Sequence, residues 1–121
     1  MNYYRQIIKG AIDVLEKNGW SKGFAARNAD GKPIHYEDSE ACSFCAFGAM
    51  LVACASIQKE QGHDCSEHLF AVRYALDVFI TRAGKYDSLF SSSTVPLFAF
   101  NDAAQSKEEV IALLNEFLET L

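Results

Sequence analysis

Three of the four cysteines lie in one nearly apolar stretch, CSFCAFGAMLVACAS, at residues 42–56. Cys42 and Cys45 have the C-x-x-C spacing of a redox dithiol, which needs a thiolate of lowered pKa, usually at a helix N-terminus with cationic neighbours. The acidic segment YEDSE (36–40) precedes the pair, however, and nearby negative charge opposes thiolate formation. The sequence therefore favours reduced cysteines packed in a core over a redox pair.

A second combination of residues has the ligand types of a structural zinc site: Cys42, Cys45, Cys65 and His68. Thiolates and an imidazole are tetrahedral zinc ligands. If residues 42–58 are helical, however, that segment is about 24 Å long at ~1.5 Å per residue, and a following antiparallel helix would begin at its far end. Zinc–ligand distances of ~2.0–2.3 Å do not span such a gap. We predict no metal and no other cofactor, and keep structural zinc as an alternative.

A cysteine nucleophile needs a histidine base and a third group that orients this base. The chain offers these residues for the three roles: Cys42 or Cys45, His35, and Asn101 or Asp102. Such a constellation is recognised by its geometry in space, which one sequence does not display. We therefore predict no catalytic residue and favour a protein without enzymatic activity, with a hydrolytic role left open as an alternative.

Two neighbouring polar side chains, Asn101 and Asp102, follow an apolar run and precede the last predicted helix. Both residue types bond nearby backbone groups in Asx turns, so a structural role at this corner is favoured over contact with a ligand or partner. Trp20 is the only tryptophan. A residue of this type closes the end of a core or anchors a binding surface.

The composition limits the classes of protein to which the chain can belong. Its 121 residues are 50% hydrophobic, which suits a single domain over residues 1–121. No run of roughly 18 uncharged apolar residues is present, so we expect no membrane span and no signal peptide, and a cytoplasmic protein. The net charge is −5, and the 11 Lys and Arg residues are scattered, which argues against a nucleic-acid partner.

Hydrophobic periodicity predicts a first helix over residues 3–18, and Gly19 is expected to adopt the left-handed conformation that ends it. A short β-hairpin is predicted over residues 24–36, because Asp30-Gly31 is a turn dipeptide between two short runs. Pro33 has no N–H to donate and limits the second strand to an edge or to its first position.

A central buried helix is predicted over residues 40–59, with Asp38 or Ser39 as its N-cap, because this segment is apolar nearly all round. Gly62 is expected to end it. Gly48 lies inside this helix and costs about 1 kcal/mol relative to alanine, which indicates a close approach by another element, for example the first or last helix.

A third helix is predicted over residues 66–82 and is stopped by Gly84. It carries a second apolar stripe beyond the core-facing one, formed by Phe70, Tyr74 and Val78. A serine-rich loop and a short extended run with Pro96 at its edge or start then precede a final helix over residues 106–121, for which Ser106 and Glu109 form a capping box.

Five short segments, in order along nearly the whole chain, resemble a family of small bacterial and phage proteins of unknown function: LEKNGWSKG, DGKPI, CSFCAFGAM, FND and SKEEVIALLNEFL. The positions that match the family's signatures are Trp20, Cys45, Gly48, Ala49, Asn101 and Asp102. Phe100 stands where the family has a tryptophan. The resemblance implies one compact domain and brings no established activity.

These observations predict an α+β fold, mainly α, in which about four helices pack around the central helix (40–59) beside a small hairpin (24–36). We expect a non-enzymatic interaction or regulatory module of bacterial or phage origin, with a protein partner or self-association as a homodimer through the third or fourth helix. The alternative is a small-ligand-binding or hydrolytic domain. The candidate contact residues for a ligand or partner are Trp20, Cys45, Asn101 and Asp102.

Overall fold

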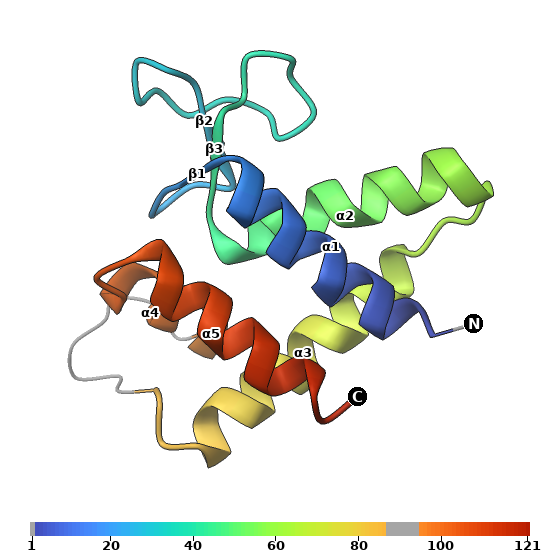
Figure 1. The fold of residues 1–121 in the computed structure, drawn as a ribbon, viewed down its shortest axis with the longest axis vertical. Coiled ribbons are helices and arrows are strands. Elements are labelled where there is room, and N and C mark those ends of the chain that lie inside the picture. Colours follow the sequence, from blue (N-terminus) through green and yellow to red (C-terminus); the bar gives the residue numbers. More distant parts are fainter. Residues whose placement is uncertain (1, 87–94) are drawn as a thin grey trace.

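Five helices and three very short strands make up residues 2–86 and 95–121, the part of the chain that the computed structural model describes (Figure 1). The helices are α1 (Tyr3–Lys17), α2 (Ala46–Gln61), α3 (Ser66–Arg82), α4 (Pro96–Ala103) and α5 (Lys107–Leu118). The strands are β1 (Gly19–Trp20), β2 (Ala26–Arg27) and β3 (Ser43–Phe44). The predicted class, α+β and mainly α, is confirmed.

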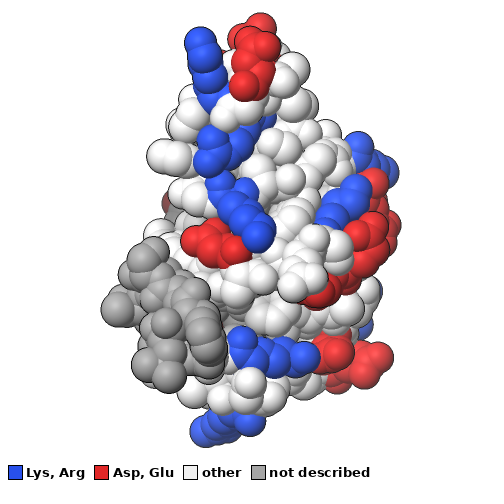
Figure 2. Space-filling view, turned by 90° about the vertical axis from the view of Figure 1, so that its left-hand side faces the viewer, with Lys and Arg blue, Asp and Glu red and all other residues white. Residues whose placement is uncertain are grey.

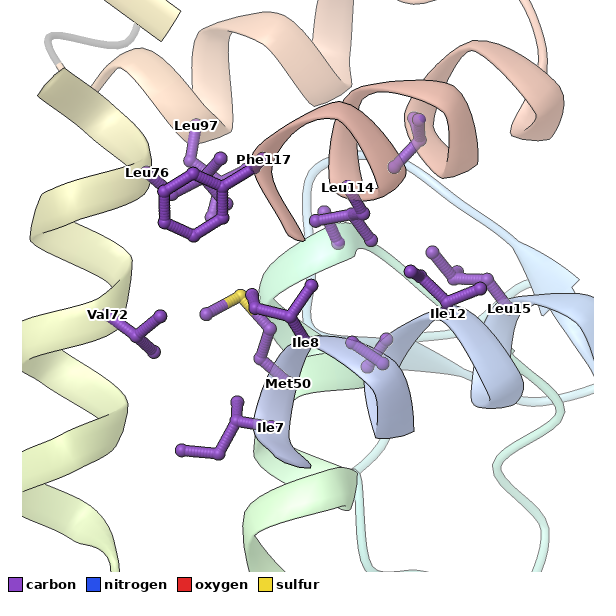
Figure 3. Close-up of a cluster of buried hydrophobic side chains, with 14 of the residues drawn as sticks. Ile7, Ile8, Ile12, Leu15, Met50, Val72, Leu76, Leu97, Leu114 and Phe117 are labelled. Atoms are coloured by element: carbon purple, nitrogen blue, oxygen red, sulfur yellow. The ribbon is translucent and has the colours of Figure 1, made fainter. Parts of the chain in front are cut away.

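The apolar core lies where α1, α2, α3 and α5 meet, and Figure 3 shows side chains from these helices pointing toward one another. Fully buried members include Ile7, Ile8, Leu15, Met50, Val72, Leu76 and Leu114. Burying each such side chain contributes about 1.5–3 kcal/mol. Gly10 lets α1 approach α2 closely, since a Cβ at Gly10 would lie 2.7 Å from the Cβ of Ala53.

Three predicted helices agree closely with α1, α3 and α5. Asn2 caps α1 by accepting from the Arg5 N–H at 3.1 Å. Ser106 caps α5 as the sequence predicts: its Oγ accepts from the Glu109 N–H at 3.3 Å. The predicted left-handed cap at Gly19 is wrong, because Asn18 ends α1 in an extended conformation and Gly19 begins β1.

The small sheet has the order β1-β3-β2, in which β3 pairs in parallel with β1 and antiparallel with β2. The predicted hairpin over 24–36 is correct in its turn and in a short antiparallel pairing beside it, where the Ile34 N–H donates to the Ala26 carbonyl at 3.1 Å, but its second run forms no strand of the sheet. The Asn28 N–H donates to the Lys32 carbonyl at 2.9 Å, and a single bridge joins Arg27 to Pro33. The strand that pairs with β2 comes from residues 43–44, which the sequence assigned to the central helix.

The central helix, α2, begins at Ala46 instead of residue 40 and continues to Gln61, where Gly62 ends it with φ +66° as predicted. The acidic residues before it form turns: the Asp38 carboxylate accepts from the Glu40 N–H at 2.8 Å. Neither Asp38 nor Ser39 is the N-cap. Cys45 has this role, and its Sγ accepts from the Gly48 N–H at 3.3 Å.

A helix, α4, replaces the extended run that the sequence predicted around Pro96, so the described chain has five helices instead of four. Proline fits the first position of a helix because the N–H it lacks has no partner there. The Leu97 N–H, one position further, donates to Asp77 Oδ1 on α3 at 2.8 Å. Most of the serine-rich loop lies outside the described residues.

None of the helices in the described part of the chain is long and apolar enough to cross a membrane. Positive and negative side chains are interspersed on the face shown in Figure 2, where a column of Lys and Arg lies beside uncharged surface and acidic side chains.

Candidate functional site

Asn101, on α4, joins three segments that are far apart in the chain. Its Oδ1 accepts from the Trp20 Nε1–H at 2.9 Å and from the Ala46 N–H at 3.0 Å. Its Nδ2 donates to the Ser21 carbonyl at 3.1 Å. The side chain is 3% exposed, so this neutral amide provides both acceptors and a donor where uncompensated polar groups would be costly. The amide thereby fixes β1, the start of α2 and α4 relative to one another.

The loop over residues 21–25 lies directly against the N-terminus of α2. The Cys45 N–H donates to the Ala25 carbonyl at 3.2 Å. A Cβ on Gly48 would overlap this same carbonyl oxygen, so only glycine allows the approach. The close approach predicted from Gly48 is thus present, but it comes from the loop instead of from the first or last helix.

The Cys45 thiol is half-buried at the N-terminus of α2. Burial raises its pKa, the nearby Asp102 carboxylate adds to the rise, and backbone hydrogen bonds from Gly48 and Phe47 oppose it. The net shift is upward, so the neutral thiol predominates at neutral pH. A thiol in this state is a weak nucleophile.

Asp102 is exposed, and its Oδ1 accepts from the Gly23 N–H at 3.2 Å. Among the residues that the structure describes, no Lys, Arg or His forms an ion pair with this carboxylate. One cation of the adjoining loop, Lys22, and one on β2, Arg27, lie over aromatic rings. Lys22 Nζ lies 5.4 Å from the Trp20 ring centroid, and the Arg27 guanidinium lies 4.9 Å from that of Phe24.

Three of the four candidate residues border one open pocket of about 500 Å³. Its lining comes from the loop, α2 and α4: Gly23, Phe24, Ala25, Cys45, Phe47, Leu51, Leu97, Phe98, Asn101 and Asp102. Pockets of this size, mostly apolar with a few polar groups, are typical of small-molecule sites. Trp20 is not part of the lining and adjoins the pocket through its hydrogen bond to Asn101.

Sequence reasoning missed the aromatic walls of this pocket. Phe47 and Phe98 meet edge to face with ring centroids 5.6 Å apart, and Phe24 is 53% exposed at the loop. Phe47 lies on α2, which is apolar nearly all round. The sequence therefore did not indicate whether Phe47 points into the core or toward a pocket. Phe98 lines the pocket from α4. The sequence predicted an extended run around Pro96 instead of this helix, so the position of Phe98 could not be predicted.

The histidines lie away from this pocket. His35 stacks on Tyr36 with centroids 4.5 Å apart, while His63 and His68 both stack on Tyr3, at 4.3 and 5.1 Å. None of them lines the pocket. The structure therefore does not bring His35 into the pocket with Cys45 and Asn101, as the cysteine nucleophile considered from the sequence would require.

The four residues of the zinc alternative are also not assembled. Cys45 begins α2, whereas the Cys65 Sγ donates to the Cys54 carbonyl further along that helix at 3.5 Å. Between residues 2 and 86 and between 95 and 121, no three His, Cys, Asp or Glu side chains are grouped to hold a metal ion. All four cysteines are free thiols.

A family model covers residues 2–119, almost the whole chain. The chain belongs to a family of unknown function, DUF6197. The match agrees with the resemblance to a family of unknown function that the short motifs indicate. No curated protein and no solved structure matches the chain. In this DUF6197 member, the features that can bind another molecule include the pocket and the exposed aromatic side chains.

Proposed function

We propose that the chain is a non-enzymatic small-ligand-binding protein, with its site in the pocket between α2, α4 and the loop over residues 21–25. One observation carries the proposal: three segments distant in sequence converge on one aromatic pocket that contains Cys45, Asn101 and Asp102. The sequence alone favoured an interaction module. The pocket shifts the preference to ligand binding, because its size and mixed lining suit a small molecule.

The walls of the pocket are fixed before any ligand arrives, which favours binding. Asn101 holds α4 against β1 and the start of α2 through three hydrogen bonds. The Cys45 N–H holds the loop against α2 by donating to the Ala25 carbonyl, and Gly48 leaves room for this contact. A site whose supporting residues are already in place loses less conformational entropy when it binds.

Binding is favoured over hydrolysis by the protonation state of Cys45, the one thiol among the described residues that line the pocket. The raised pKa keeps Cys45 as a neutral thiol, and no histidine borders the pocket to act as its base. General-base activation of a thiol needs such a partner within hydrogen-bond reach.

A fragment screen by two-dimensional NMR tests this proposal. Small aromatic compounds are expected to shift the amide signals of Gly23, Ala25 and Asn101 in preference to those of α5. Leu51→Trp places a large side chain in the pocket and should abolish these shifts. Ser56→Trp adds the same side chain to the exposed face of α2 and should leave them unchanged. Shifts that persist in Leu51→Trp, or a wild-type chain that binds no fragment, would contradict the proposal.

Self-association through α3 is a second candidate function, supported by two exposed aromatic side chains. Phe70 is 56% exposed and Tyr74 is 67% exposed on one helix face. Glu67 lies near the N-terminal end of this helix and Arg82 at its C-terminal end. An antiparallel two-fold pairing of two copies would oppose these charges and join the aromatic residues, as an isologous dimer requires.

Sedimentation velocity distinguishes this dimer from a monomer. We expect a concentration-dependent dimer for the wild-type chain and a monomer for Tyr74→Glu with an unchanged far-ultraviolet circular dichroism spectrum. Ser56→Glu adds the same charge to an exposed position of α2 and should still dimerise. A wild-type chain that stays monomeric at millimolar concentration would exclude this candidate.

A further inference from the structure

The charge and lining of the pocket indicate which class of ligand it takes. We infer, on the basis of the proposed ligand-binding function, that the ligand is an amphiphilic amine: an aromatic or aliphatic body that carries a protonated amino group. The body occupies the apolar walls, and the ammonium group binds the Asp102 carboxylate.

The apolar part of the site matches a flat or branched hydrocarbon group. Phe47, Leu51, Leu97 and Phe98 contribute walls from α2 and α4. The rings of Phe47 and Phe98 meet at an angle of 61°, so their faces point in different directions. Aromatic faces attract cations as well as hydrocarbon groups. A ligand that carries a hydrocarbon body and a cation therefore gains affinity from both interactions.

Among the described residues that line the pocket, Asp102 is the only charged one. An ionised carboxylate accepts up to about four hydrogen bonds, and the one that Asp102 is known to receive comes from the Gly23 N–H. None of the ion pairs among the described residues involves it. The carboxylate therefore retains the capacity to accept from a ligand.

The two nearby cations, Lys22 and Arg27, form no ion pair with the Asp102 carboxylate. Arg27 donates through Nε and Nη2 to the Lys22 carbonyl and through Nη1 to the Gly31 carbonyl, while its guanidinium covers the Phe24 ring. Lys22 Nζ lies over Trp20. Lys22 in the loop and Arg27 on β2 are thus both engaged by other groups, and neither residue belongs to the lining.

An ammonium group is the ligand group that this arrangement favours most. It forms a charge-assisted hydrogen bond with a carboxylate, which is about twice as strong as a neutral one. A ligand carboxylate would meet the like charge of Asp102 and be repelled. An alcohol would gain only a neutral hydrogen bond, so the expected order of affinity is amine, then alcohol, then carboxylate.

Three probes of nearly equal shape and different charge test this order: 2-phenylethylamine, 2-phenylethanol and 3-phenylpropanoate. Titrations at pH 7 would be followed by the amide signals of Gly23 and Asn101. We expect the amine to bind about threefold more tightly than the alcohol, because the Asp102 carboxylate is exposed and solvent screens its attraction. Asp102→Asn retains an oxygen to accept from Gly23 and should bring the affinities for amine and alcohol together. Asp30→Asn removes one exposed charge outside the pocket and should preserve the difference.

The outcomes separate this inference from the proposed function. Tighter binding of the amine that disappears in Asp102→Asn supports the inference. Equal binding of amine and alcohol, or tighter binding of the carboxylate, with shifts confined to the pocket overturns the amine class and leaves ligand binding standing. If no probe shifts the pocket signals, and a broader fragment screen does not shift them either, the proposed function fails and the inference fails with it.

Discussion

The apolar core between α1, α2, α3 and α5 and the polar junction around Asn101 hold their elements by different means. We use the name polar junction for the contacts of Asn101 with Trp20, Ser21 and Ala46. In the core, many buried apolar side chains each contribute to stability, and their contacts do not depend on direction. In the junction, one amide side chain with three hydrogen bonds sets the position of α4.

This difference explains where a binding site can arise. The core is filled, and its close helix contact between Gly10 and Ala53 leaves no room for a ligand. The junction instead joins short elements at fixed positions through hydrogen bonds, and the pocket lies beside it. An apolar core is stabilised by close packing on all sides, whereas a hydrogen bond acts along one direction. The space beside a hydrogen bond can therefore remain open as a pocket.

Gly48→Ala should give the largest effect and test the rigidity of the loop beside the junction. The added Cβ would overlap the Ala25 carbonyl oxygen, a backbone atom with little freedom to move. We expect a loss of about 4 kcal/mol in the free energy of unfolding, measured by urea denaturation. Gly10→Ala is the matched core variant. Its added Cβ would lie 2.7 Å from the Cβ and 3.5 Å from the Cα of Ala53, so α1 and α2 must move slightly apart, while the helix gains propensity; its loss should be smaller, about 2 kcal/mol. Equal losses would contradict the comparison.

Asn101→Leu removes the centre of the junction at nearly constant volume. It leaves the buried Ala46 N–H and the Trp20 Nε1–H without their acceptor, which should cost about 3 kcal/mol. Leu114→Ala in the core should cost a similar amount, about 3 kcal/mol. The two variants should nevertheless differ in native fluorescence, because Trp20 is the only tryptophan. We expect a shifted emission maximum in Asn101→Leu alone, and a shift in Leu114→Ala would show that the two regions are not separable.

Asp77 supports the junction from a distance by accepting from the Leu97 N–H at the start of α4. Asp77→Ala leaves this N–H unpaired and should cost about 1–2 kcal/mol, whereas Asp77→Asn keeps an acceptor and should cost less than about 1 kcal/mol. Both losses would be measured by urea unfolding at pH 7. The reverse order would exclude this hydrogen bond as the reason for the effect.

The same residue makes stability depend on pH. Burial raises the pKa of Asp77 above its ordinary value of 3.8, against the opposing effects of the Leu97 N–H and Arg73. The folded chain therefore holds this proton more tightly than the unfolded chain, so the contribution is present below 3.8 and is lost as the pH rises through the raised pKa. In that interval the stability of the wild type should fall with pH relative to Asp77→Asn. A constant difference between the two unfolding curves would contradict the raised pKa.

Cys45→Ser should have the smallest effect. A serine hydroxyl is a better N-cap than a thiol and can accept from the Gly48 N–H, so the stability should change by less than about 1 kcal/mol. Thermal unfolding would measure the change. Because the proposed site binds through Asp102 and its aromatic walls, probe affinity should also change little. A complete loss of a measured activity in a stable Cys45→Ser chain would show that the thiol is chemically required.

Much of the core follows from the sequence, because helical periodicity and local caps act over a few residues. The helices α1, α3 and α5 have such patterns, and Ser106 with Glu109 marks the start of α5 correctly. Gly62 likewise marks the end of α2. These signals belong to the segment itself and do not depend on what packs against it.

The polar junction was less accessible to prediction, since its elements are defined by distant partners. The start of α2 was misplaced because acidic residues that often cap helices form turns here, and a cysteine supplies the cap. The helix α4 was missed because its first free N–H is satisfied by Asp77 from another helix. Residue types identified Asn101 and Asp102 as candidates, but only the fold shows the pocket beside them.

The hydrogen bonds of Asn101 also have a consequence for how the chain assembles and opens. The Trp20 Nε1–H and the Ala46 N–H, which both donate to its Oδ1, lie 81 and 55 positions earlier in the chain. Contacts between such distant residues close late, because the entropy of the intervening chain must be lost before they form. The core contacts of α1 with α5 join residues still further apart and also close late. Because only a few hydrogen bonds hold the polar junction, we expect the pocket to open locally before the core unfolds. The fraction of chains that are folded and the fraction that are competent to bind are then two separate quantities.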